Sequence, residues 1–223
     1  MENEEKFSVD TENLKEETKD TVNQVKESIK NVNFKNDAEE TKGFLKEMLS
    51  NPFEAVRKIA CEEENVLNKV VMIMLVFIAA SFAYSLISVI KYGKYSGVLD
   101  NILSLVAGVL DPVFFVLAPS VMILLLNKEN KKSLTTIIST IVVASVPVVI
   151  NYLIDIVELV LSGISLITGP ISTGLSAVAL VLTYFGMKDL FGIEEHKDFI
   201  KKYAVIKVAA ALIITILVRI GIS

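Results

Sequence analysis

The chain has 223 residues, of which 52% are hydrophobic and only 22% charged, and its formal net charge is −4 at pH 7. This composition is more apolar than that of a typical soluble domain. One Cys excludes a disulfide-stapled secreted scaffold, and a pI near 5.2 argues against a nucleic-acid-binding protein. The charge is uneven, since residues 1–69 carry 17 of the 26 acidic side chains and 11 of the 22 basic ones.

Residues 1–50 predict an acidic cytoplasmic tail, largely disordered or partly helical, because they are polar and charged throughout. An apolar repeat at Val22, Val25, Ile29 and Val32 has helical spacing, but it is too short for a stable coiled coil. The alternative is a tail that folds on a partner. The partners expected for this tail are other membrane proteins or cytoplasmic proteins.

Residues 51–69 predict an amphipathic helix that lies at the membrane interface before the first span. Asn51 can cap a helix, Pro52 suits the first helical position, and Glu54 stands where a capping-box acid would stand. We expect this helix to rest along the cytoplasmic face of the bilayer.

Residues 70–223 predict a membrane domain, because a bilayer core about 30 Å thick requires about 20 mostly apolar helical residues. Five stretches meet this requirement, at 70–90, 102–126, 134–153, 171–187 and 203–222. The predicted fold class is therefore an all-α, polytopic helical bundle with five transmembrane helices.

Two of these stretches contain residues that favour a break. Asp111 is an acid inside the second stretch, and Asp111-Pro112 is also a helix-start signal, so residues 97–110 could span, re-enter or lie at the interface. We expect a capping or kinking role for this pair, with transport or proton coupling as the alternative. Gly169-Pro170 indicates a break in the fourth stretch, which predicts an interfacial or re-entrant lead-in at 159–169.

The Lys and Arg residues of the short loops predict the orientation. Basic residues stay on the cytoplasmic side, and the loops before span one, after span two and after span four carry most of them. This favours the N-terminus inside and the C-terminus outside. The polar N-terminus lacks a signal peptide, so we expect an uncleaved, multi-pass protein of a cytoplasmic membrane. Lys outnumbers Arg 20 to two, which hints at an AT-rich bacterial source.

The third stretch carries polar residues on one helical face. Pro147, Asn151, Asp155 and Glu158 follow one another at steps of three and four. The side-chain oxygens of Asn151, Asp155 and Glu158 could attract a cation. Asp155 and Glu158 fall beyond the expected end of the span, however, so the simpler interpretation is that they are solvated at the level of the outer headgroups. We expect Asn151 to be the member buried among helices.

The sequence lacks the motifs of common enzymes, such as His-Glu-x-x-His, Gly-x-Ser-x-Gly or a phosphate loop. We therefore expect a protein that is not an enzyme and has no catalytic residues, no cofactor and no bound metal. Ser172 and Ser176, four residues apart in the fourth stretch, predict close contact between helices.

Several features in order resemble the Yip family of five-span membrane proteins, in its bacterial form. These features are the acidic tail, Asn51-Pro52-Phe53, the loop at 127–132, Pro147 and the segment at 188–193. The resemblance implies a protein that binds other proteins or organises membranes, and a Rab partner would not carry over to a bacterial chain.

The predicted function is therefore an interaction scaffold. The alternative is a small-solute or ion permease that uses the broken helices around Asp111 and Asn151. The further expected partners are the lipid bilayer and, in a homo-oligomer, other copies of the same chain.

Overall fold

The computed structural model describes residues 11–31, 34–61, 67–126, 132–161 and 164–191. The regular elements in these residues are all helical, which confirms the all-α class for the described part of the chain. They are α1 (Thr11–Asn31), α2 (Phe34–Ser50), α3 (Pro52–Ala60), α4 (Leu67–Tyr92), the 3-10 turn η1 (Gly93–Tyr95), α5 (Val98–Leu126), α6 (Leu134–Ala144), α7 (Val146–Val160) and α8 (Ser165–Phe191).

Three helices of the described residues are long and apolar enough to cross a membrane, namely α4, α5 and α8. The pair α6 and α7 adds a fourth span if the bent pair is counted as one. These elements correspond to the first four predicted spans. The fifth predicted span, at 203–222, lies outside the described residues.

The third predicted span is bent instead of straight. Helix α6 ends at Ala144, and α7 begins at Val146 after a turn of 42°. Pro147 explains the break, since it has no N–H for the carbonyl of Val143 and its ring clashes with a straight continuation. The Ser145 hydroxyl donates to the Ile141 carbonyl at 2.7 Å and closes the end of α6.

The two breaks expected at other prolines are absent. Helix α5 runs through Asp111 and Pro112 without interruption, so the prediction that Asp111 caps a helix is wrong. Helix α8 begins at Ser165 and contains Gly169-Pro170, so the predicted lead-in at 159–169 is also wrong in its second half. Each proline costs one backbone hydrogen bond, whereas ending the helix in an apolar environment would expose several unpaired groups.

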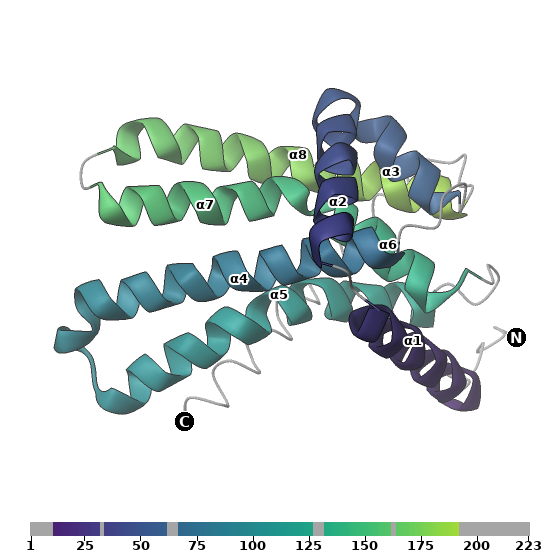
Figure 1. The fold of residues 1–223 in the computed structure, drawn as a ribbon, viewed down its shortest axis with the longest axis horizontal. Coiled ribbons are helices and arrows are strands. Elements are labelled where there is room, and N and C mark those ends of the chain that lie inside the picture. The colour runs from purple at the N-terminus through teal and green to yellow at the C-terminus, as the bar shows by residue number, and fades with distance from the viewer. Residues whose placement is uncertain (1–10, 32–33, 62–66, 127–131, 162–163, 192–223) are drawn as a thin grey trace, which may run out of the picture.

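The long helices form two antiparallel pairs (Figure 1). Helices α4 and α7 run away from the end where α1, α2 and α3 gather, and α5 and α8 return to it. Helix α4 packs against both α5 and α7, which joins the two pairs. Phe77 of α4 contacts Val149 of α7 in a small buried cluster at this junction.

The first 50 residues form two helices where they are described. Helix α2 buries Thr41, Phe44 and Met48 on one side, because steps of three and four place them on one face. Phe44 and Met48 belong to the main buried cluster of the molecule. The described residues of this tail are thus helical, in α1 and α2.

Helix α3 begins at Pro52 as predicted, but it does not rest on the bilayer surface alone. Its apolar face, including Val56 and Ile59, is buried with Ile141 of α6 and Leu182 of α8. The Asn51 side chain makes no capping hydrogen bond. The apolar face of α3 therefore packs against other helices of the protein, and its position at a membrane interface stays a prediction.

Candidate functional site

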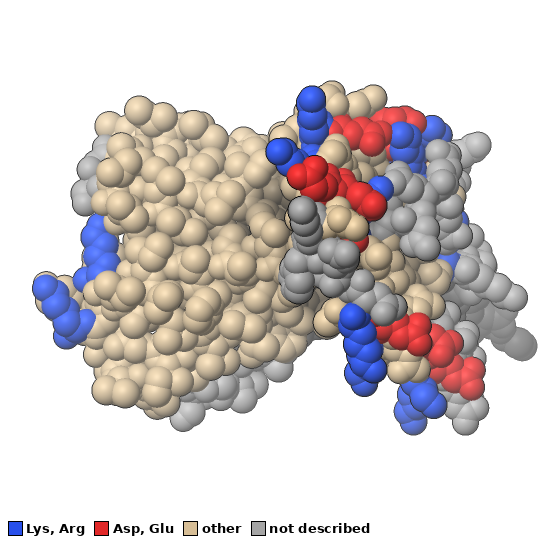
Figure 2. Space-filling model, viewed as in Figure 1, with Lys and Arg blue, Asp and Glu red and all other residues tan. Residues whose placement is uncertain are grey.

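The surface divides the molecule into a charged end and a long uncharged body (Figure 2). On the face shown, acidic residues gather over α1, α2 and α3, while the body formed by α4, α5, α7 and α8 is uncharged until lysines mark its far end. Many apolar side chains on the surface of this body are exposed, for example Leu166 at 88% and Val98 at 79%. An exposed apolar surface of this extent indicates embedding in a membrane. Lys91, in the last turn of α4, and Lys94, in η1, lie at the far end of this body.

The charged end is built from α1, α2 and α3, which we call the N-terminal platform. Lys58 of α3 forms an ion pair with Glu47 of α2, with 2.6 Å between Nζ and Oε1. Helix α1 contacts α6 through polar groups, since the Thr135 hydroxyl donates to Gln24 Oε1 at 3.0 Å and lies 3.3 Å from the Thr21 hydroxyl. The ion pair thus joins α2 to α3 within the platform, and the polar contacts of α1 attach it to α6.

Two of the four apolar residues of the repeat in α1 are exposed, a third, Val25, is half-buried, and Val32 lies outside the described residues. Val22 is 43% and Ile29 53% exposed, whereas Thr21 and Ser28 are buried. The docked side of α1 therefore includes two hydroxyl residues, Thr21 and Ser28, with Val25 between them, while Val22 and Ile29 remain exposed. The sequence signal that was missed is the Thr41–Phe44–Met48 spacing in α2, which predicts the docked helix better than the α1 repeat does.

Asn151 joins α7 to α8 inside the bundle, as predicted. Its Nδ2 donates to the Ser172 carbonyl at 3.0 Å and to the Ser176 hydroxyl at 2.9 Å. Its Oδ1 is buried and has no hydrogen-bond partner. The predicted contact between helices at Ser172 and Ser176 is therefore confirmed, and it is polar as well as close.

Asp155 and Glu158 continue this face of α7 toward the far end. The Ser172 hydroxyl donates to Asp155 Oδ1 at 3.4 Å, and the Thr168 hydroxyl donates to Glu158 Oε2. Pro147, at the start of the same face, is buried at the bend. The predicted polar line along α7 thus faces α8. The described residues contain no group of three or more acidic, His or Cys side chains placed to hold a metal ion.

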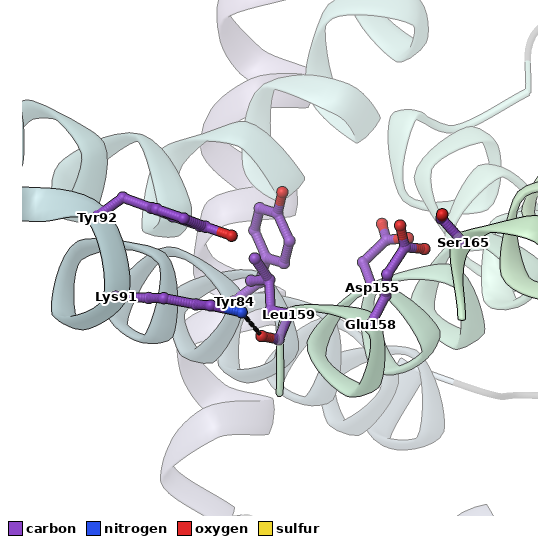
Figure 3. A pocket seen from close by; sticks show the side chains of 7 residues that line it. All are labelled: Tyr84, Lys91, Tyr92, Asp155, Glu158, Leu159 and Ser165. Carbon is purple, nitrogen blue, oxygen red and sulfur yellow. Dashed lines mark hydrogen bonds between the residues drawn. The ribbon is translucent and has the colours of Figure 1, made fainter. Parts of the chain in front are cut away.

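A polar pocket of about 430 Å³ opens between α4, α7 and α8 at the far end. Its lining residues are Tyr84, Lys91, Tyr92, Asp155, Glu158, Leu159 and Ser165 (Figure 3). Lys91 Nζ donates to the Leu159 carbonyl and holds the end of α4 against the end of α7. The structure therefore brings Asp155 and Glu158 to tyrosines that the sequence analysis did not single out.

Asp111 does not line this pocket. It is half-buried in the middle of α5, next to the buried Pro112. The rings of Tyr152 and Tyr84 lie 6.1 Å apart, centroid to centroid. Asp111 is thus separate from the pocket, whereas Tyr152 contacts the lining residue Tyr84.

Comparison with known proteins finds no family model, no curated protein and no solved structure that matches the chain. The resemblance to the Yip family therefore stays a prediction from the residues quoted for it. The platform and the far-end pocket are the two places where the geometry itself indicates binding.

Proposed function

We propose that this chain is a non-enzymatic, multi-pass protein of a bacterial cytoplasmic membrane that holds other proteins at the cytoplasmic face through its N-terminal platform. A scaffold must connect its binding surface firmly to its anchor. The supporting feature is the shared core, because Phe44, Met48 and Val56 of the platform pack in one buried cluster with Ile141 and Leu182 of the membrane helices.

The observation that carries the proposal is the orientation of α1. A helix in water normally turns its apolar side toward the protein, yet α1 buries Thr21 and Ser28 and presents Val22 and Ile29. An apolar pair on a helix that is already docked is available to a partner helix or groove. The partner expected here is a cytoplasmic protein or the cytoplasmic part of another membrane protein.

The proposed orientation places the platform inside the cell. The N-terminal platform, the end of α5, the start of α6 and the end of α8 lie at the same end of the molecule (Figure 1). The sequence segments that follow α5 and α8, at 127–133 and 188–202, hold seven of the 11 Lys and Arg residues of positions 70–223. The positive-inside rule then assigns this end to the cytoplasm. With residues 203–222 as a fifth span, the C-terminus lies outside.

Membership of the Yip family is part of the same proposal. The family resemblance implies five spans and a role in protein interaction or membrane organisation. The order of the described helices is compatible with it, since two antiparallel pairs precede the fifth predicted span.

The test is photo-crosslinking in living cells from a reactive residue placed at Val22 or at Ile29. The matched control is Leu49, an apolar residue on α2 that is 67% exposed on the same platform. We expect one protein to be captured in stoichiometric yield from positions 22 and 29 and not from position 49, and to be lost in Val22→Ser/Ile29→Ser. Equal capture from all three positions, or recovery of the chain without a partner, would contradict the scaffold role.

A permease is the second candidate, because the third span is bent at Ser145 and the Oδ1 atom of Asn151 is buried without a partner near the bend. Discontinuous helices commonly surround transport sites. Solute flux into vesicles that contain only this purified chain, abolished by Asn151→Leu or Asp111→Asn with folding intact, would favour the permease. Absence of flux together with a partner captured at Val22 would favour the scaffold.

A further inference from the structure

The far-end pocket has two chemically different walls. Tyr84 and Tyr92 of α4 form an aromatic side, and the carboxylates of Asp155 and Glu158 on α7 point into the space opposite (Figure 3). The volume of about 430 Å³ lies within the range of about 300–1,000 Å³ that is usual for small-molecule sites. It is therefore larger than a site for one bare ion requires.

The electrostatics of the pocket favour a cation. Asp155 and Glu158 are three residues apart on α7, so two carboxylates lie next to each other on one side of the pocket. Each carboxylate has a hydroxyl donor from α8, Ser172 for Asp155 and Thr168 for Glu158, which fixes the carboxylates but adds no positive charge.

Lys91 contributes a positive charge at one edge of the pocket. Its Nζ donates to the Leu159 carbonyl and lies 5.5 Å from the centre of the Tyr92 ring. With one lysine and two carboxylates among the lining residues, the formal charge of the lining is negative. The two carboxylates would therefore repel an anion such as phosphate and attract a cation.

We propose that this pocket binds an organic ammonium group, held between the carboxylates of Asp155 and Glu158 and the aromatic side chains of Tyr84 and Tyr92. Aromatic rings attract ammonium groups through their electron-rich faces, and carboxylates form charge-assisted hydrogen bonds with them. A calcium ion would instead require six to eight oxygen ligands, and the lining offers rings where those ligands would stand. The inference is independent of the scaffold role.

The position of the pocket admits two sources of the ammonium group. The pocket is lined by Tyr92 and Lys91 at the end of α4, where the uncharged body ends, and Tyr95, which follows in η1, is 77% exposed. Tyrosines and lysines at the end of a span mark the level of lipid headgroups. The ammonium could therefore belong to an aminophospholipid of that leaflet or to a free amine from the solution outside.

The test uses the purified full chain in a nonionic detergent and follows tyrosine fluorescence and the thermal unfolding temperature. The chain has no Trp, so tyrosine emission reports directly on the six Tyr residues. The probes are tetramethylammonium chloride and ethanolamine, each compared with potassium chloride at equal ionic strength. A second arm compares nanodiscs that contain phosphatidylethanolamine with nanodiscs that contain its N-acetylated form, which lacks the ammonium charge.

The variants are Asp155→Asn and Glu158→Gln, which remove charge and keep an oxygen for the α8 hydroxyls. Asp100→Asn is the matched control, because Asp100 lies at the same end of the molecule and does not line the pocket. We expect each pocket variant to weaken binding about tenfold and Asp100→Asn to leave it unchanged.

The probe responses and the unfolding temperatures test the proposal together, so the test does not depend on one variant. A response to the soluble ammonium probes supports a free amine, and a higher unfolding temperature only with unmodified phosphatidylethanolamine supports a lipid headgroup. A response equal to that of potassium chloride, together with equal unfolding temperatures in both nanodiscs, would overturn the proposal. A response that the pocket variants and Asp100→Asn all retain would overturn it as well.

Discussion

Gly186 lies where α8 crosses the N-terminal platform and α6. A Cβ atom added at this position would stand 2.6 Å from Val56 Cγ1 and 2.7 Å from Thr140 Cγ2. Both neighbours are β-branched and have little rotamer freedom in a helix, so neither can move aside at low cost. We expect Gly186→Ala to destabilise the protein by about 1–3 kcal/mol, measured by unfolding in mixed micelles.

Gly174 of the same helix provides the matched control for this substitution. Nothing lies within 4 Å of a Cβ added there. Gly174→Ala should therefore leave stability unchanged or raise it by up to about 1 kcal/mol, because Ala favours the helix. Equal effects at the two glycines would contradict the close crossing at Gly186.

Asn151 is expected to stabilise the contact between α7 and α8. Asn151→Leu removes the hydrogen bonds to the Ser172 carbonyl and the Ser176 hydroxyl while nearly keeping the side-chain volume. We expect a loss of about 1 kcal/mol in unfolding experiments, since hydrogen bonds inside membranes are typically of this size. A double-mutant cycle with Ser176→Ala should show coupling, and strictly additive losses would exclude the Ser176 bond.

Glu54 provides a test by pH. The Arg57 side chain donates two hydrogen bonds to the Glu54 carboxylate, at 2.9 and 3.1 Å, and this holds the pKa of Glu54 below its ordinary value of 4.5. The stabilisation is therefore present above pH 4.5 and is lost as the pH falls through the lowered pKa. In carboxyl NMR titrations, Arg57→Gln should raise the pKa of Glu54 more than Lys58→Gln does. The reverse order would contradict the assigned pairing.

At the scale of elements, helix α2 is expected to stay folded because of its buried side rather than its helix propensity. Met48 is 2% exposed, whereas its neighbour Leu49 is 67% exposed. Met48→Ala should cost about 2–5 kcal/mol and Leu49→Ala less than about 0.5 kcal/mol. Hydrogen exchange should accelerate across residues 34–50 in the first variant, with α4 protected. Unchanged exchange would mean that α2 does not depend on this packing.

Some helices could be predicted from the sequence, whereas the positions of the helix breaks could not. Helix α4 was predictable because an uncharged run of its length has no alternative in a bilayer. The sequence prediction of a single third span does not include the bend at Ser145, although it includes Pro147. Conversely, Pro112 and Gly169-Pro170 are predicted to interrupt helices, and they lie inside continuous helices. A proline carries the same local cost everywhere, and tertiary packing decides whether the helix bends there.

The candidate site divides in the same way. The line from Asn151 through Asp155 to Glu158 followed from helical spacing within one segment. Its aromatic partners, Tyr84 and Tyr92, come from a helix more than 60 positions away, and only the pairing of α4 with α7 brings them together. The α1 face was visible as a repeat, but which side of it docks depended on contacts with Thr135.

At the scale of the whole molecule, the chain is an apolar body with a charged platform at one end and a polar pocket at the other. The described residues hold three long apolar helices and one bent pair, which accounts for four of the five predicted spans. This architecture requires that Cys61, an exposed free thiol at the end of α3, and Tyr95, 77% exposed in η1, lie on opposite sides of the membrane.

The most direct test labels these two positions in intact spheroplasts with a membrane-impermeant maleimide. The native chain carries Cys61 as its one cysteine, and Cys61→Ser with Tyr95→Cys moves the thiol to the other end. The account predicts that Cys61 reacts only after the membrane is permeabilised and that the thiol at position 95 reacts in intact spheroplasts. Reversed labelling would contradict a cytoplasmic platform, and labelling of both thiols from outside would contradict a bundle that spans the membrane between them.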